Sequence, residues 1–140
     1  MENNRPYLLL LEENRFFLYI YIMKKYSLKS IILENCPWSK ALDELLKTKK
    51  IKSDIIIVNS NTKHKYKNDI IDTFPQLYIV TNKKELLVGG YTETKRLLDI
   101  INNHSHESPE QRLTIIKKKF NELLPNYTNK EILYLIKLLL

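Results

Sequence analysis

Cysteine and glycine are scarce in this chain. Among its 140 residues there is one cysteine, Cys36, and there are two glycines, Gly89 and Gly90. A single cysteine cannot form an internal disulfide, which excludes a disulfide-stabilised secreted scaffold. A cysteine-based zinc site is excluded as well, because no second cysteine joins the three histidines, His64, His104 and His106.

Long hydrophobic runs are also missing. The apolar segments Tyr7–Leu11 and Phe16–Met23 are separated by the polar residues Glu12–Arg15, so neither approaches the roughly 20 residues that span a bilayer. Helical spacing of apolar side chains predicts a helix over 14–26, with Tyr7–Leu11 forming a short strand or part of that helix. The first residues lack a basic stretch and a small-residue cleavage site, so we expect no signal peptide. We expect a cytoplasmic protein in a reducing compartment, without a membrane partner.

The formal net charge is +7, and lysines cluster around 47–52, 63–67 and 117–119. Such clusters can follow a phosphate backbone. No zinc finger, RNP-type aromatic strand or Gly-x-x-Gly loop accompanies them, however. We therefore interpret the lysines as solvated faces of helices and turns and expect no nucleic-acid partner.

Hydrophobic residues make up 44% of the chain, enough for the core of about one domain. A short apolar strand over Lys29–Glu34 precedes an amphipathic helix over Pro37–Lys50, and a β-branched run over Asp54–Asn59 follows. This order predicts a βαβ unit with parallel strands and a right-handed crossover. A continuous β-branched run also suggests that the second strand is covered on both faces.

The second half predicts a short helix over Lys63–Ile71 and a β-hairpin formed by Gln76–Val80 and Glu85–Val88. A further helix begins at Tyr91 or Thr92 and runs to about Asn102. Together these elements predict an α/β fold with a four-stranded mixed sheet flanked by helices.

The C-terminal tail contains two helix starts, at Ser108-Pro109-Glu110-Gln111 and at Thr128-Asn129-Lys130-Glu131, separated by a break at Pro125–Tyr127. We therefore divide the chain into a domain over residues 1–103 and a two-helix extension over 104–140. We expect the apolar stripes of the tail to pack on the parent domain; they consist of Leu113, Ile116, Phe120, Leu123, Ile132, Leu135 and Leu139.

The position of Cys36 suggests chemistry. It opens Cys36-Pro37-Trp38-Ser39, between the first strand and the first helix. The unpaired N–H groups and the positive dipole end of a helix N-terminus favour a thiolate, and Pro37 suits the first helical position. The alternative is a buried core cysteine; further segments decide in favour of a reactive thiol.

Three segments together resemble a glutaredoxin of the thioredoxin-fold superfamily, over residues 16–103. Cys36–Ser39 is similar to the family's C-P-Y-C or C-P-Y-S motif, Thr73-Phe74-Pro75-Gln76 to its T-V-P-Q segment, and Gly89–Glu93 to its G-G-C-S/D-D segment. The resemblance implies a thioredoxin-like (glutaredoxin) fold of the single-cysteine C-P-W-S type, with Pro75 cis and facing the thiol.

The resemblance also implies which residues act. Cys36 would be the nucleophile, supported by Pro37 and Ser39. A glutathione cysteine would pair with the Phe74 backbone, and the helix N-terminus near Thr92 would hold the γ-glutamyl carboxylate. The implied glutathione-binding residues are Lys40, Thr73, Phe74, Pro75, Gly90, Tyr91, Thr92 and Glu93.

Two departures from the family pattern affect the mechanism. Ser39 replaces the resolving cysteine, so a two-thiol mechanism is excluded. Leu33 stands where the family has a lysine, and Glu34 follows it. A helix terminus contributes about 0.3–1 kcal/mol, whereas one pKa unit requires about 1.4 kcal/mol. The Ser39 hydroxyl and Lys40 must add to the dipole, and we expect a thiol pKa above that of a typical glutaredoxin.

Three functions are compatible with these residues. The first is glutathione-dependent thiol–disulfide exchange by a monothiol enzyme, with glutathione as co-substrate and glutathionylated or disulfide proteins as partners. The second is a [2Fe–2S] cluster shared by two chains, each giving Cys36, with two glutathiones as the other ligands; the relatives that do this typically have C-G-F-S. The third is a non-catalytic interaction module. We expect a monomer unless a cluster bridges two chains.

Overall fold

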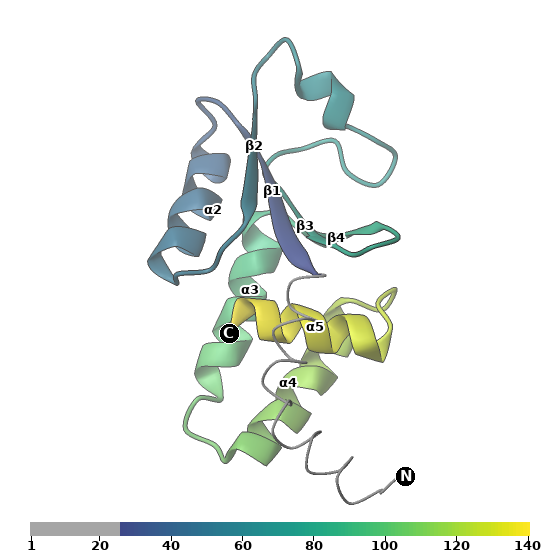
Figure 1. The fold of residues 1–140 in the computed structure, drawn as a ribbon. Coiled ribbons are helices and arrows are strands. Elements are labelled where there is room, and N and C mark those ends of the chain that lie inside the picture. The colour runs from purple at the N-terminus through teal and green to yellow at the C-terminus, as the bar shows by residue number, and fades with distance from the viewer. Residues whose placement is uncertain (1–25) are drawn as a thin grey trace, which may run out of the picture.

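The structure is a computed structural model, in which residues 26–140 are described (Figure 1). The helix predicted over 14–26 and the strand predicted over Tyr7–Leu11 lie outside these residues, apart from Tyr26. The described elements are β1 (Ser27–Leu33), α2 (Pro37–Thr48), β2 (Asp54–Val58), the 3₁₀ helix η1 (Lys63–Tyr66), β3 (Gln76–Val80), β4 (Glu85–Gly89), α3 (Tyr91–Asn103), α4 (Pro109–Leu123) and α5 (Asn129–Leu139).

The four strands form one mixed sheet in the order β2-β1-β3-β4. β1 and β2 are parallel, paired from Lys29 with Asp54 to Leu33 with Val58. β3 is antiparallel to both β1 and β4. The βαβ unit and the hairpin predicted from the sequence are confirmed. The protein has a thioredoxin-like fold, with Cys36 directly after the carboxyl end of β1.

The core lies where α2 and α3 meet the sheet. Leu28 and Ile79 are paired across β1 and β3, so their side chains share one face of the sheet. Both are buried and belong to one cluster with Leu42 and Leu46 of α2 and Leu97 of α3. Among residues 26–140 no helix is both long and apolar enough to cross a membrane.

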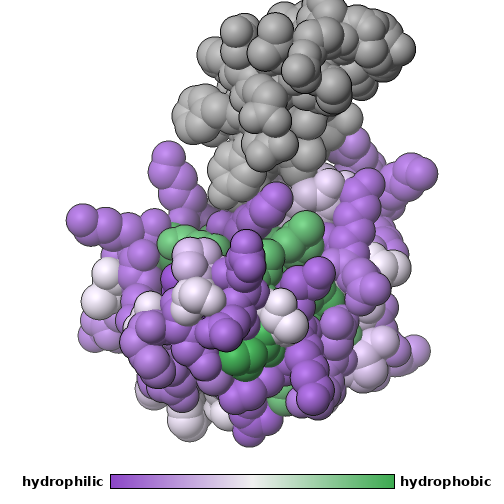
Figure 2. Space-filling view, turned by 90° about the horizontal axis from the view of Figure 1, so that it is seen from below, coloured by the Kyte–Doolittle hydropathy of each residue, from purple (hydrophilic) through white to green (hydrophobic). Residues whose placement is uncertain are grey.

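The tail helices α4 and α5 lie near the amino end of β1, away from the end that carries Cys36 (Figure 1). Tyr26, just before β1, stacks on Tyr134 of α5 with ring centroids 4.0 Å apart. Ile116, Phe120 and Leu135 belong to the same buried cluster as the sheet residues, which confirms that the tail packs on the parent domain. Figure 2 views this end, and the coloured surface there is mostly hydrophilic, with small hydrophobic patches between the hydrophilic residues.

Both predicted caps of the tail are present. Ser108 Oγ accepts a hydrogen bond from Gln111 N, and Thr128 and Glu131 form a reciprocal capping box. Two stripe positions differ from the prediction, because Leu113 and Leu123 remain 40% and 38% exposed. The buried part of the apolar stripes therefore contains fewer residues than their sequence spacing suggested.

The prediction that the Asp54–Asn59 run is covered on both faces is wrong. Ile55 is 44% exposed and Ile57 is 63% exposed, whereas Val58 is buried. Ile55 and Ile57 are two residues apart, so they share one face of β2, and that face is open to solvent. β2 is also an edge strand in the described sheet, so only β1 supplies neighbouring side chains along it. A continuous β-branched run fits such an edge as well as a buried strand.

The helix predicted over Lys63–Ile71 is also wrong in extent, because only η1 forms. The Asn68 side chain accepts hydrogen bonds from the backbone N–H groups of Ile70 and Ile71. Asparagine side chains that bond locally in this way compete with helix formation. Ile70 is 82% exposed as a result, and residues 67–75 form a loop without regular secondary structure.

Candidate functional site

A tight turn carries the chain from β1 into α2. Asn35 has a φ of 60°, a left-handed conformation that asparagine adopts more readily than most residues. The N–H of Cys36 donates to Leu33 O at 3.3 Å. Cys36 is then the N-cap of α2 with an extended backbone, and Pro37 occupies the start of the helix. This geometry places the thiol at the N-terminus of α2, as the sequence predicted.

Ser39 links this turn to the strand. Its side chain is fully buried, and its hydroxyl oxygen accepts a hydrogen bond from Leu33 N at 2.9 Å. A hydroxyl that accepts from the backbone still has its own hydrogen to donate. Ser39 is therefore built into the active turn as both an acceptor and a donor.

The pKa of the Cys36 thiol lies below its ordinary value. Partial burial acts in the opposite direction and raises the pKa. The backbone N–H and the hydroxyl of Ser39, together with the N–H of Trp38, stabilise the anion and outweigh that burial. Neither Glu34 nor Lys40 is among the causes of the shift. Hydrogen bonds from the first turn of α2, with no charged side chain among the causes, thus lower the thiol pKa.

The Thr73–Pro75 turn lies beside the thiol. The Phe74–Pro75 peptide bond is cis, and the Cys36 Sγ lies 4.0 Å from the Phe74 carbonyl oxygen. Both predictions for this turn, the cis bond and the contact with Cys36, are confirmed. A backbone so close to the sulfur can pair with the backbone of a bound thiol compound.

The N-terminus of α3 meets the same turn. Gly89 has a φ of 140°, and a Cβ there would lie 2.5 Å from Glu93 Cβ, so a side chain is excluded. Gly90 approaches Pro75 closely, since a Cβ on it would lie 3.3 Å from the Pro75 carbonyl oxygen. Glu93 Oε1 accepts a hydrogen bond from Gly90 N at 2.6 Å. The adjacent glycines thus allow the sharp bend and close packing that the sequence suggested.

These segments enclose a hollow of about 290 Å³. Glu93 carries the one formal charge among its lining residues. Trp38 is 60% exposed and lines the hollow, and its ring lies 5.7 Å from that of Tyr91. The complete lining consists of Trp38, Ile71, Thr73, Phe74, Pro75, Gly90, Tyr91, Thr92 and Glu93.

The structure brings most of the predicted site residues together. Seven of the eight implied glutathione-binding residues line the hollow, and Cys36 adjoins it through Phe74. Lys40 is exposed on α2 and is not a lining residue. No group of three or more metal-binding side chains occurs among residues 26–140.

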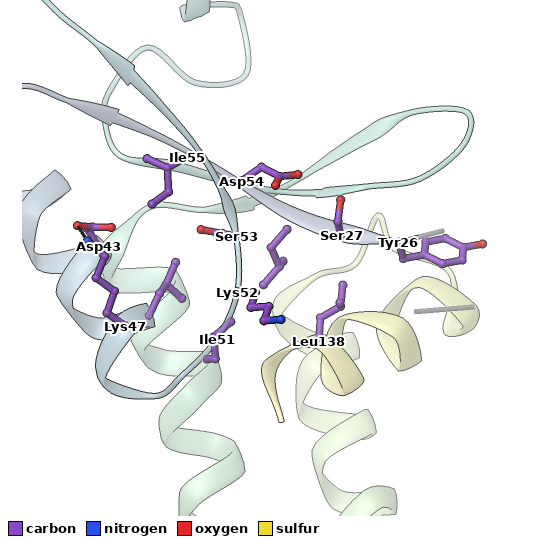
Figure 3. Close-up of a pocket in the computed structure, with 12 residues that line it drawn as sticks. Tyr26, Ser27, Asp43, Lys47, Ile51, Lys52, Ser53, Asp54, Ile55 and Leu138 are labelled. Atoms are coloured by element: carbon purple, nitrogen blue, oxygen red, sulfur yellow. Dashed lines mark hydrogen bonds and ion pairs between the residues drawn. The ribbon is translucent and has the colours of Figure 1, made fainter. Parts of the chain in front are cut away.

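A larger hollow, of about 580 Å³, lies elsewhere, between the end of α2, the start of β1 and α5 (Figure 3). Its lining residues include Leu46, Ile51 and Leu138, together with Asp43 and Lys47, which form an ion pair at 2.9 Å. No cysteine or histidine lines it. It therefore offers no thiol or imidazole, and the smaller hollow beside the Cys36 thiol is the candidate active site.

Two residues of the site were missed by sequence reasoning. Ile71 lines the hollow although it was assigned to a helix. Gln76 belongs to the quoted Thr73–Gln76 segment but was interpreted only as the first residue of a strand. Its side chain is fully buried, and its amide nitrogen donates hydrogen bonds to Tyr66 O and to Thr73 O, in the turn that carries Phe74. The sequence signal for this role was a polar residue at the start of an otherwise apolar strand.

No protein family model matches the sequence, and no curated protein matches it. A search of solved structures finds a similarity to glutaredoxin 1 from Francisella tularensis in complex with cacodylate, at 23% sequence identity and a TM-score of 0.46. The match covers 56% of this chain and 98% of that chain. A function for this chain must therefore be inferred from its own residues around Cys36.

Proposed function

We propose that this protein is a monothiol oxidoreductase that uses glutathione to reduce glutathione mixed disulfides through Cys36. The observation that carries the proposal is the juxtaposition at the thiol. Its Sγ lies 4.0 Å from the Phe74 carbonyl, at a helix N-terminus whose hydrogen bonds lower the thiol pKa. A lowered pKa raises the thiolate fraction, and the thiolate is the attacking species.

The reaction has two exchange steps. The Cys36 thiolate attacks the glutathione sulfur of a mixed disulfide, which forms a Cys36–glutathione disulfide and releases the target as a thiolate that takes a proton from water. A second glutathione, as thiolate, then attacks the sulfur of the bound glutathione. Glutathione disulfide leaves and Cys36 returns as a thiolate, so Ser39 in place of a second cysteine is no obstacle.

Backbone groups would supply most of the binding. The Phe74 backbone would pair with the cysteine of glutathione. In α3 the first intrahelical bond is from Thr94 N to Gly90 O, so the N–H groups of Tyr91 and Thr92 precede it and suit the γ-glutamyl carboxylate. The Glu93 carboxylate, already bonded to Gly90 N, would face the ammonium of the same γ-glutamyl group. Thr73, Pro75 and Trp38 would shape the walls.

Lys40 would not contact the bound glutathione in this proposal. It is exposed and outside the lining, so it would act only by long-range attraction on the anionic co-substrate. A [2Fe–2S] cluster would require a second chain and two glutathiones, because this chain offers one thiolate. No observation at the site favours that arrangement over exchange.

The test is a turnover assay with a glutathione mixed disulfide of a small thiol, in which glutathione disulfide is measured as it forms. Wild-type protein should turn over and should trap one glutathione on Cys36 when free glutathione is withheld, as mass spectrometry would show. Absence of both turnover and the trapped adduct would reject the proposal. An absorption spectrum of freshly purified protein reveals a cluster if one is present.

A further inference from the structure

Gln76 stands at a junction of three segments next to the site. It is the first residue of β3 and is fully buried. Its amide nitrogen donates to Tyr66 O at 2.9 Å and to Thr73 O at 3.1 Å. Its amide oxygen accepts from the Tyr78 hydroxyl at 2.8 Å. One side chain therefore connects η1, the turn beside the thiol and the sheet.

The loop that Gln76 holds has few other restraints. Residues 67–75 form no helix. The Asn68 side chain accepts hydrogen bonds from the N–H groups of Ile70 and Ile71 within the loop, and it also bonds to the Tyr78 hydroxyl of β3. Because both variants of the experiment below lack that hydroxyl, this second link does not differ between them. Thr73 precedes Phe74, whose carbonyl lies 4.0 Å from the thiol. Fixing the Thr73 carbonyl therefore fixes the backbone that faces the sulfur.

We propose that Gln76 is a positioning residue, whose amide N–H groups hold the Thr73–Pro75 turn in the geometry that binds the thiol co-substrate. The inference rests on the proposed exchange reaction for its kinetic consequence. It assigns Gln76 no contact with substrate. The amide acts on binding through the turn, whereas the pKa of Cys36 is set separately by Ser39 and Trp38.

The experiment compares Tyr78→Phe with the double variant Gln76→Met/Tyr78→Phe. The single variant removes the donor to the amide oxygen and leaves both N–H bonds. The double variant also removes both N–H bonds, because methionine is similar in size to glutamine but has no amide. Since residue 78 is already phenylalanine, no tyrosine hydroxyl is left without its hydrogen-bond partner. Three quantities are measured below the unfolding temperature: KM and kcat for the glutathione mixed disulfide, the alkylation rate of Cys36, and amide hydrogen exchange of residues 67–75.

Relative to Tyr78→Phe, the double variant should raise KM at least about tenfold and speed exchange of residues 67–75 by a similar factor. The kcat and the alkylation rate should change less than about threefold. Equal KM and equal hydrogen exchange in the two variants would overturn the proposal, as would an alkylation rate that falls in step with turnover. If wild-type protein shows neither turnover nor the trapped glutathione adduct, the exchange reaction is rejected, while hydrogen exchange still decides whether Gln76 holds the turn.

Discussion

The end of the molecule around the start of β1 and the end that carries Cys36 are built differently. Around the start of β1, Tyr26 stacks on Tyr134, and the tail buries Phe120 and Leu135 completely. At the other end, the apolar side chain of Trp38 in the Cys36 turn is 60% exposed, and Ile70, in the loop that leads to Phe74, is 82% exposed. A connecting loop there is held mainly by side-chain hydrogen bonds rather than by a packed helix.

The two ends therefore contribute to different properties: the tail end mainly to the stability of the fold, and the Cys36 end mainly to reactivity. Buried apolar area provides most of the free energy of folding, and the described tail residues add to it. The open end contributes less burial, but its backbone groups remain available to a ligand. We therefore expect substitutions near Cys36 to change reactivity with little loss of stability, and substitutions in the tail to do the reverse.

Replacement of the nucleophile should have the largest effect. Cys36→Ser should abolish glutathione exchange, because a serine hydroxyl is not ionised at neutral pH and forms no disulfide. The free energy of unfolding should change by less than about 0.5 kcal/mol, since the side chain is only partly buried. Turnover and urea unfolding test the two halves of this expectation. Residual exchange in Cys36→Ser would contradict it, because the chain has no other thiol.

The tail should show the opposite pattern. Phe120 is fully buried in α4, so Phe120→Ala should lower the free energy of unfolding by about 3–5 kcal/mol. Exchange activity should persist in the fraction that stays folded. Leu123→Ala is the matched control on the same helix, and because Leu123 is 38% exposed it should cost about 1 kcal/mol or less. Equal losses in the two variants, measured by urea unfolding, would mean that the tail is not part of the core.

The sequence predicted the fold largely because its signals are local and agree with one another. The Ser108 and Thr128 caps, the Cys36–Pro37 helix start and the hairpin each depend on a few neighbouring residues. The two errors have different origins. The exposure of Ile57 depends on strand order, which a β-branched run does not encode. The loss of the helix after Tyr66 depends on competition from the Asn68 side chain.

The site was predictable in most of its members but only in part in its electrostatics, because Ser39 lowers the Cys36 pKa as expected whereas Lys40 is not among the causes of the shift. The segments around Cys36, Pro75 and Gly90 carry recognisable residue types, and the structure brings them together. The sequence indicated that the Ser39 hydroxyl supports the thiolate, and it does. That Ser39 also accepts a hydrogen bond from Leu33 N could not be inferred, because this bond depends on how the turn closes. Gln76 was missed for the same reason, since its partners Tyr66, Thr73 and Tyr78 come together only when the loop between η1 and β3 closes.

Removal of the Ser39 hydroxyl should have an intermediate effect on reactivity. Ser39→Ala deletes a hydrogen bond that lowers the Cys36 pKa, so the pKa should rise. The alkylation rate increases as pH rises through the thiol pKa, and its midpoint should therefore move to higher pH. At pH 7 the rate should fall roughly two- to fivefold, as expected for a bond worth about 0.5–1 kcal/mol. The measurement is the pH profile of alkylation.

Ser30→Ala is the control for Ser39→Ala. Ser30 is another buried serine of the same region, and its hydroxyl bonds to Ser53 Oγ at 3.0 Å rather than to the active turn. It should lose comparable stability, about 1 kcal/mol, without shifting the alkylation midpoint. A midpoint that moves equally in both variants would show that the shift reflects general loosening and not the Ser39 bond.

The smallest effect should come from Glu34. Its side chain is exposed, and it is not among the groups that shift the Cys36 pKa. Glu34→Lys should therefore lower that pKa only slightly and raise the alkylation rate at pH 7 by less than about threefold, because exposed charges interact weakly through water. The gain should shrink between low and 0.5 M salt, since the screening length falls below about 10 Å. A large, salt-resistant gain would show that the Glu34 carboxylate opposes the thiolate at close range. It would also show that the charge at position 34 affects reactivity more than the hydrogen bonds of Ser39 and Trp38 do.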